Sequence, residues 1–373
     1  MKTDYFHTCF ALDQIFVHLD GSVNACCMAR RNLTEIGVAA DAGIFAAKRH
    51  VNAMVVDAND ASLCWKDCPV RQRVATRPNS EQVNKIVVYT NTFCPLACQF
   101  CSLAYTQDAP EWSESTRPKP EENTVWNARD KSGDPVPPVR VRTNNMPNLL
   151  ANLRRLVADA PEPQKLFFEF TGGDSAYHPE FVEALDYLAS ENINITYLSS
   201  GVVPQKVMPD ILRHVASGRL FITISPDAID PDTWAKIKRR PARLFDEVLN
   251  FIHRVATTRS QQIGVKFIVL EANRIEAPVF MPFFTALGVH RFVLSEYRSQ
   301  PTFFIPPLPE NDLEEICSLV RHVFRNADLP DGSELTIIGL ERFFDGRNYL
   351  KREPLDFLPL VRPAPLMEEE AHL

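Results

Sequence analysis

The stretch KIVVYTNTFCPLACQFC, residues 85–101, joins a short apolar run to three closely spaced cysteines. The run IVVY consists of β-branched and aromatic side chains, which is typical of a buried strand. Cys94, Cys98 and Cys101 follow within a few residues of its end. The segment therefore predicts a strand that carries three thiols on a loop at its carboxyl end.

Further strand-like runs follow along the chain, and stretches with apolar residues at helical spacing separate them. Alternation of this kind predicts an α/β fold with a parallel sheet and helices outside it. The strand-like runs are KLFFEFTG (165–172), INITYLSS (193–200), LFITIS (220–225), VKFIVLEA (265–272) and RFVLSEY (291–297). The helical stretches are FVEALDYLASEN (181–192), VMPDILRHVAS (207–217), LFDEVLNFIHRVA (244–256) and APVFMPFFTALG (277–288).

The composition is that of a folded globular protein. Of 373 residues, 45% are hydrophobic and 23% are charged, which excludes a largely disordered chain. The 47 acidic residues outnumber the 40 basic ones, and the net charge of -7 disfavours nucleic acid as a partner. No apolar run has the length of a membrane span, and the first residues lack the pattern of a signal peptide. We expect a cytoplasmic protein with no membrane partner.

Nine cysteines in a reducing compartment favour metal or redox roles over a disulfide framework. Thiolates are soft ligands, and three of them in one short loop suit three irons of a cubane iron-sulfur cluster. The fourth iron would keep an open coordination position, as catalytic zinc sites do. Taken alone, the spacing of Cys94, Cys98 and Cys101 is also compatible with a zinc site or with chance.

Phe100 stands directly before the last cysteine, and with it the loop resembles that of the radical S-adenosylmethionine (radical SAM) enzymes. The hallmark of this family is the same three-cysteine spacing with an aromatic residue in that place. The resemblance covers about residues 86–297 and implies a partial (β/α)6 TIM-like barrel. It also implies that Cys94, Cys98 and Cys101 bind a 4Fe-4S cluster and that Phe100 lies beside the bound cofactor.

The turn Gly172-Gly173-Asp174 ends the second predicted strand and resembles the glycine-glycine-acid motif of the same family. In that motif the acid receives the methionine amino group of S-adenosylmethionine. Asp174 stands here where the family usually has Glu, so its reach is one methylene shorter. Glycines let a backbone approach a ligand closely, and a carboxylate complements an ammonium.

The next two predicted strands also end in polar residues that resemble cofactor contacts of the family. Ser200 lies in a Ser-Ser-Gly segment, and Ser225 and Asp227 lie in Ser-Pro-Asp. The resemblance implies that these ends hold the ribose and methionine portions of S-adenosylmethionine. An aspartate at a strand end also commonly caps the following helix, and this alternative stays open for Asp227.

The resemblance implies reductive cleavage of S-adenosylmethionine to a 5'-deoxyadenosyl radical, which then removes hydrogen from a substrate. A reductant such as flavodoxin or ferredoxin would supply the electron. We expect a small metabolite, sugar-like or nucleoside-like, as substrate, and an oxidation, epimerisation or isomerisation as the net reaction. The alternatives are a peptide maturase that forms a cross-link or an epimerised residue, a modifier of a nucleic acid base, and a metal-stabilised binding protein without activity.

Four further cysteines form two groups near the N-terminus: Cys9 with Cys26, and Cys64 with Cys68. The run FVHLDGSVNACC (16–27) predicts a hairpin that brings Cys26 back toward Cys9. The spacing of cysteine, glycine and cysteine resembles the SPASM and twitch modules, which implies a second, auxiliary 4Fe-4S cluster on these four cysteines in a lobe over residues 1–80. A zinc site is the alternative. Cys27 is expected to be a small buried hydrophobe.

The barrel is expected over residues 81–300, with a proline-rich insertion at 104–147 that is either a lid or a solvated excursion. Residues 301–373 are expected to form a helix (DLEEICSLVRHVFR, 312–325) and a tail, with Cys317 in the core.

His178 is expected to cap a helix. The basic run KIKRR (236–240) is expected to be a solvated helix end, and binding of a carboxylate or phosphate is the alternative.

Overall fold

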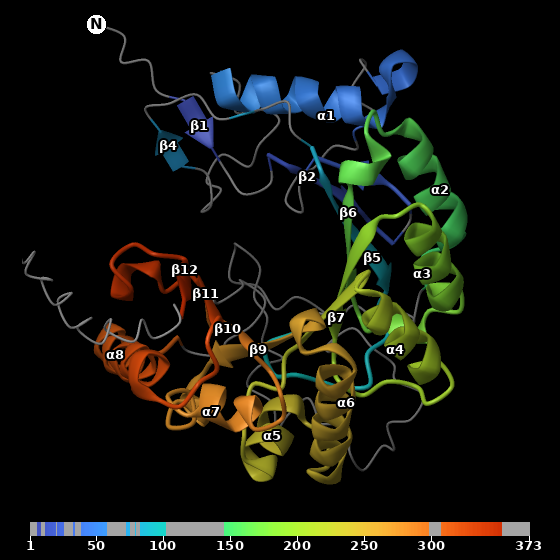
Figure 1. Cartoon of the computed structure of the whole chain (residues 1–373). Helices are drawn as coiled ribbons and strands as arrows, with labels where there is room; N and C mark the ends of the chain where they lie inside the picture. Colours follow the sequence, from blue (N-terminus) through green and yellow to red (C-terminus); the bar gives the residue numbers. More distant parts are fainter. Residues whose placement is uncertain are drawn as a thin grey trace, which may run out of the picture.

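A computed structural model describes residues 6–8, 12–19, 21–25, 33, 39–57, 72–74, 79, 83–101, 145–297 and 307–352. Its main feature is a 10-stranded sheet of order β12-β11-β10-β9-β8-β7-β6-β5-β2-β3 (Figure 1). The predicted strands form its centre and pair in parallel, which confirms the α/β fold. They are β5 (Lys85–Asn91), β6 (Phe167–Gly172), β7 (Asn194–Ser199), β8 (Leu220–Ile224), β9 (Ile263–Val269) and β10 (Arg291–Glu296).

The predicted N-terminal hairpin is present and joins this sheet. β2 (Gln14–Val17) pairs in parallel with β5, and β3 (Val23–Asn24) runs antiparallel to β2. Gly21 lies in the turn with a φ of 80°, a conformation that glycine adopts without strain. The hairpin therefore extends the barrel sheet on the side of the strand that leads to Cys94.

The sheet also continues past residue 300, where the sequence had suggested a helix and a tail. β11 (Glu334–Ile338) pairs in parallel with β10, and β12 (Tyr349–Lys351) runs antiparallel to β11. A separate pair of antiparallel strands is formed by β1 (Phe6–Thr8) and β4 (Gln72–Val74).

Helices cover the outer face of the curved sheet (Figure 1). The helices predicted from their periodicity are present, as is the helix that was expected to end near residues 236–240. The helices near residues 40–57 and 150 were not predicted. The helices are α1 (Ala39–Asp57), α2 (Leu149–Asp159), α3 (Phe181–Ser190), α4 (Met208–Ser217), α5 (Pro231–Lys238), α6 (Arg243–Arg259), α7 (Phe280–Thr285) and α8 (Glu310–Asn326). Short 3-10 turns lie at Pro163–Lys165, Ser175–Tyr177, Ser260–Gln262, Glu271–Asn273 and Glu341–Phe343.

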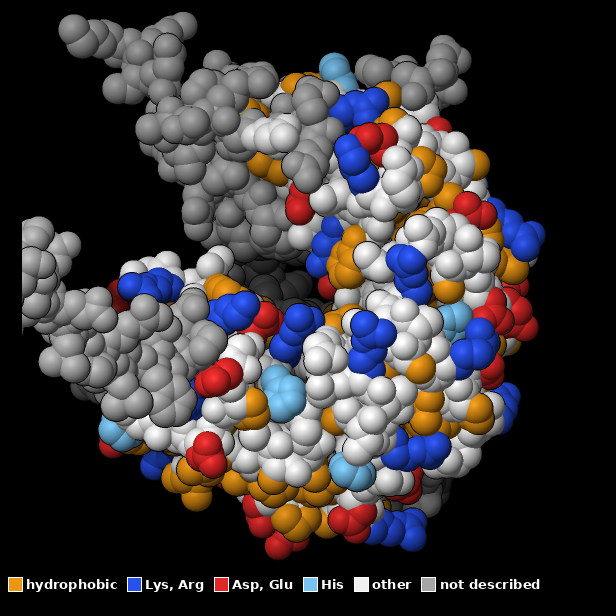
Figure 2. Space-filling model, viewed as in Figure 1, with side chains coloured by type: hydrophobic (Ala, Val, Ile, Leu, Met, Phe, Trp, Pro, Cys, Tyr) orange, Lys and Arg blue, Asp and Glu red, His pale blue; other side chains and the backbone are white. Residues whose placement is uncertain are grey.

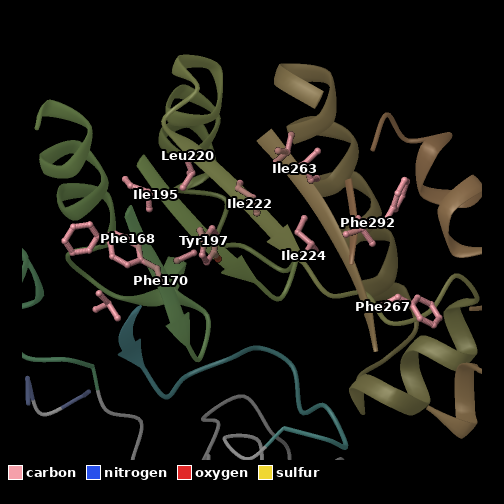
Figure 3. Close-up of a cluster of buried hydrophobic side chains, with 14 of the residues drawn as sticks. Phe168, Phe170, Ile195, Tyr197, Leu220, Ile222, Ile224, Ile263, Phe267 and Phe292 are labelled. Carbon is pink, nitrogen blue, oxygen red and sulfur yellow. The ribbon is translucent and has the colours of Figure 1, made fainter. Parts of the chain in front are cut away.

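The core lies between the strands and the helices, where alternate strand residues are apolar (Figure 3). Phe170 packs against Phe181 of α3, and Phe267 packs against Phe280 of α7, with ring centroids 6.1 and 4.9 Å apart. Successive side chains of a strand point to opposite faces. The residues between these apolar positions therefore face the concave side of the sheet, which we call the lumen.

The sheet is open. No ladder joins β3 to β12 in the part of the chain that the structure describes, so the architecture is that of a partial barrel. Figure 2 shows the molecule hollowed in the middle of one face, with Lys and Arg side chains along the described rim. Among the described helices, none is both long and apolar enough to span a bilayer.

We expect the strand core to dominate stability. Ile222 of β8 is fully buried, whereas Ile338 at the end of β11 is 42% exposed. Ile222→Ala should lower the free energy of unfolding by about 2 to 5 kcal/mol, since it removes buried methyl groups and leaves a cavity. Ile338→Ala should change it by less than about 1 kcal/mol. Equilibrium unfolding in urea measures both, and equal losses would contradict this assignment of the core.

Candidate active site at the carboxyl ends of the strands

The predicted cysteine loop follows β5 directly, at the edge of the sheet where the parallel strands end. Cys94, Cys98 and Cys101 are all half-buried thiols. The backbone N–H of Cys101 donates to the carbonyl of Cys98 at 3.0 Å, which closes a turn between the last two cysteines. Both of these thiols act electrostatically on Cys94, so the structure places all three within one small region.

Burial controls the ionisation of these thiols. Burial raises the pKa of Cys94 well above its usual value, and nearby Asp174 raises it further. Burial likewise raises the pKa of Cys98 to about 11, although the ammonium of Lys238 acts in the opposite direction. Both thiols are therefore protonated near neutral pH until a metal displaces the protons.

The donor set of the loop fits an iron-sulfur cluster. Three thiols are soft ligands, and each ligand of a cubane cluster binds a different iron. Such ligands need not converge on one point. The described residues contain no group of three His, Cys, Asp or Glu side chains arranged to hold a single metal ion.

The glycine pair at the end of β6 lies tightly against the chain that leads into the cysteine loop. The N–H of Gly173 donates to the carbonyl of Asn91 at 2.7 Å, and the N–H of Asp174 donates to that of Phe93 at 2.6 Å. Gly172 has a φ of 108°, and a Cβ on Gly173 would collide with the carbonyl oxygen of Phe93. The glycines thus let two backbone segments pass close to each other. The prediction had explained them by the close approach of a ligand.

Asp174 is fully buried, and its carboxylate is bonded to the protein itself. It accepts hydrogen bonds from the hydroxyls of Tyr197 and Ser200, from the N–H of Ser200 at 2.8 Å and from that of Ala176 at 3.2 Å. Desolvation raises the pKa of this carboxyl group, and the bonds from Ser200 and Tyr197 oppose the rise. In this geometry Asp174 fixes the end of β7 beside the end of β6. The predicted contact of its carboxylate with an ammonium stays a prediction.

Asp227 is also fully buried, and its backbone has a φ of 57°, an uncommon value for a residue with a side chain. Its carboxylate accepts from the hydroxyl of Ser225 at 2.9 Å and from the N–H of Ile268 at 2.7 Å. The ammonium of Lys238 lies 2.5 Å from it. Asp227 caps no helix in this structure, because Asp230 caps α5. It links the ends of β8, β9 and α5 instead.

The expectation that the basic run 236–240 is a solvated helix end is wrong for Lys238, whose side chain is 1% exposed. Burial disfavours its ammonium, but Asp227 outweighs this effect and the pKa of Lys238 rises. Lys238 also donates to the carbonyl of Ser225 at 2.7 Å. The burial of Lys238 could have been predicted from its spacing from Trp234. Residues four apart share one helix face, and Trp234 is fully buried.

The end of α5 holds the cysteine loop in place. The N–H groups of Ala97 and Gln99 donate to the carbonyls of Lys238 and Ile237, at 3.0 and 2.9 Å. The ammonium of Lys238 lies 5.1 Å from the ring centroid of Phe100, within range of a cation–π interaction. Arg240, two residues further on, donates to the carbonyl of Pro95. Lys238 thus packs against Phe100, and the predicted place of Phe100 beside the cofactor stays a prediction.

The other predicted residues fall into two groups. His178 is buried and accepts from the N–H of Glu180 at 3.1 Å just before α3, which agrees with a structural role, and Cys317 lies in the core as expected. Cys9, Cys26, Cys27, Cys64 and Cys68 lie outside the described residues, as do residues 102–144 of the proline-rich insertion. The auxiliary cluster and the lid therefore stay predictions.

The ion pair between Asp227 and Lys238 should be important for stability. Lys238→Met would leave the Asp227 carboxylate buried without its partner, and we expect a loss of about 3 to 5 kcal/mol in the free energy of unfolding. Lys236→Met, on an exposed position of the same helix, should change it by less than about 0.5 kcal/mol. Urea unfolding of both variants checks this, and a small effect at Lys238 would show that the pair is dispensable.

Among solved structures, the chain is similar to Streptococcus suis SuiB bound to S-adenosylmethionine, with 13% identity and a TM-score of 0.48. The similarity covers 70% of this chain and 52% of SuiB, so this chain spans about half the length of that protein. The chain is also similar to a radical SAM methyltransferase from Sphaerobacter thermophilus, with 13% identity, a TM-score of 0.46 and coverage of 73% and 70% of the two chains. None of the curated proteins matches this sequence.

The model of the Radical SAM superfamily matches residues 88–269, from within β5 to the end of β9. The matched segment contains the cysteine loop and the polar ends of β6, β7 and β8 described above. Residues 88–269 of this chain are therefore similar to the radical SAM superfamily, in agreement with the resemblance on which the prediction of a radical SAM enzyme rests.

Proposed function

We propose that this protein uses a 4Fe-4S cluster on Cys94, Cys98 and Cys101 to cleave S-adenosylmethionine reductively and to abstract hydrogen from a small substrate. The observation that carries the proposal is the cysteine loop itself. Its three thiols lie together at the strand ends, and α5 and the end of β6 hold the loop through backbone hydrogen bonds. A loop fixed in this way is prepared for a rigid cluster without a large rearrangement.

When bound, a cluster with one open iron would pass an electron to the sulfonium of S-adenosylmethionine and release methionine and a 5'-deoxyadenosyl radical. The chain's own residues would orient the cofactor and keep water away. We assign the cofactor contacts to Phe100, Gly172, Gly173, Ser200 and Ser225, which lie on the loop or at neighbouring strand ends. Asp174 and Asp227 would act mainly by fixing these strand ends, since both carboxylates bond to the protein.

The substrate class, the reductant and the cellular location belong to the same proposal. The lumen opens beside the cysteine loop, and a metabolite of sugar or nucleoside size would be held there. A flavodoxin or ferredoxin in the cytoplasm would provide the electron. Hydrogen abstraction converts the radical to 5'-deoxyadenosine, so this product reports the reaction even while the substrate is unidentified.

We expect anaerobically reconstituted protein to form 5'-deoxyadenosine from S-adenosylmethionine when dithionite is added. The triple variant Cys94→Ala, Cys98→Ala, Cys101→Ala should lose this activity and about four irons per chain, because it removes the ligands of one cubane cluster. Cys317→Ala should keep both, since this thiol lies in the core away from the loop. Chromatography of the product with iron and sulfide analysis gives the readout, and unchanged cleavage in the triple variant would refute the proposal.

We also propose an auxiliary 4Fe-4S cluster on Cys9, Cys26, Cys64 and Cys68, in a lobe over residues 1–80. A closed cluster of four thiolates would serve electron transfer or stabilise the lobe. Its presence would favour an oxidation as the net reaction.

Cys26→Ala tests the auxiliary cluster, with its neighbour Cys27→Ala as the matched control. We expect the first variant to lose about four irons per chain, because a cubane needs its full ligand set, and the second to keep them. Metal analysis by atomic emission measures iron and zinc together. If the unaltered protein holds one zinc per chain and Cys26→Ala loses it, the four cysteines bind zinc and not an iron-sulfur cluster.

A further inference from the structure

Lys266 of β9 lies on the lumen face of the sheet, among residues that the cofactor proposal does not use. Its neighbours Val265 and Phe267 are fully buried on the helix side, so the side chain between them points the other way. Lys266 is paired in register with Val293 of β10. On its other side Val265 pairs with Ile224, the last residue of β8, so Lys266 lies beside Ser225.

The ammonium of Lys266 has no carboxylate within ion-pair distance among the residues that the structure describes. The two acids that act on it electrostatically are Glu169 and Asp227. Both are already paired, Glu169 with Lys85 at 2.9 Å and Asp227 with Lys238 at 2.5 Å. Among these described groups, Lys266 is therefore the ammonium that has no carboxylate of its own.

The side chain of Lys266 is half-buried, and this partial burial makes its charge costly. Desolvation lowers the pKa of Lys266, Asp227 and Glu169 offset only part of this effect, and the nearby ammonium of Lys238 lowers the pKa further. A charge removed from water is normally compensated by a partner of opposite sign. An anion that entered the lumen would supply that partner, and the ammonium would then stay charged.

The residues around Lys266 would suit an anion on a partly apolar molecule. Thr223 of β8 faces the same side of the sheet, opposite Gly264, and brings a hydroxyl that can donate a hydrogen bond. Below it lies the ring of Phe221, with Arg291 stacked at 5.3 Å from the ring centroid. Arg291 itself is bound to Glu334 at 3.0 Å, so its charge is already compensated.

We propose that Lys266 binds an acidic group of the substrate, a carboxylate or a phosphate, in the lumen below the cofactor site. The proposal rests on the proposed function, because it takes the lumen to be the substrate site. It identifies the substrate class as an anionic small molecule whose acidic end is directed into the barrel and whose reacting carbon lies toward the cysteine loop.

The test is a calorimetric titration of the reconstituted protein saturated with S-adenosylmethionine, so that the cofactor's own carboxylate is already bound. Inorganic phosphate and succinate are titrated separately, against chloride at equal ionic strength. We expect Lys266→Met to weaken binding of at least one of them about tenfold, the effect of a lost charge-assisted hydrogen bond. Lys266→Arg should retain binding within about threefold, since it keeps the charge. Lys206→Met, at an exposed position, is the matched control and should bind as the unaltered protein does.

Three outcomes would overturn the proposal. In the first, neither probe binds the unaltered protein. In the second, both probes bind Lys266→Met as tightly as they bind the unaltered protein. In the third, Lys266→Met weakens the binding of S-adenosylmethionine itself about tenfold. The last result would assign the lysine to the cofactor's carboxylate. If Lys266→Met fails to fold, acetylation of Lys266 in the unaltered protein replaces it, and phosphate or succinate should slow the labelling. Cleavage of S-adenosylmethionine is measured separately, so failure of the anion site does not count against the radical reaction.

Discussion

The ammonium of Lys238 and the carboxylate of Asp227 meet 2.5 Å apart where neither is exposed to water, and the arrangement of the site depends on this contact. Asp227 reaches β9 through Ile268, and Lys238 reaches the cysteine loop through Phe100 and through its own carbonyl. One pair thus connects a strand end, a helix end and the loop. Two isolated buried charges would be costly, so each side chain keeps the other in place.

A second buried carboxylate plays the same part on the neighbouring strands. Asp174 bonds to Tyr197 and Ser200 and so draws the end of β7 toward that of β6. The shorter side chain of aspartate suits this inward role, because the acid lies at the sheet edge and need not extend into the lumen. Both acids that the sequence singled out as cofactor contacts are thus used, at least in part, to build the edge on which a cofactor would rest.

The sequence predicted the central strands and most of the helices because their apolar residues recur at the periods that burial imposes. It also placed the thiols correctly, since a loop of eight residues leaves them little freedom to separate. Lys238 escaped prediction because a lysine in a basic run is ordinarily exposed, and only the packing of Trp234 beside it places it inside. The pairing of β2 with β5, and the strand β11, escaped for a different reason: the partner strands are distant in the sequence, so pairing rather than propensity defines them.

The attachment of β2 to β5 has a practical consequence for anyone who trims this protein. A fragment that began near residue 81 would keep the whole cysteine loop, yet it would strip the bonding partner from the strand that carries the loop. An unpaired strand edge can pair with strands of other molecules, so the fragment would aggregate next to the thiols. α1 strengthens the point, since its Asn52 donates to the carbonyl of Leu12 before the β2–β3 hairpin and its Lys48 donates to that of Ala25 after it. Studies of the radical chemistry should therefore retain the N-terminal residues even where their own role is not the question.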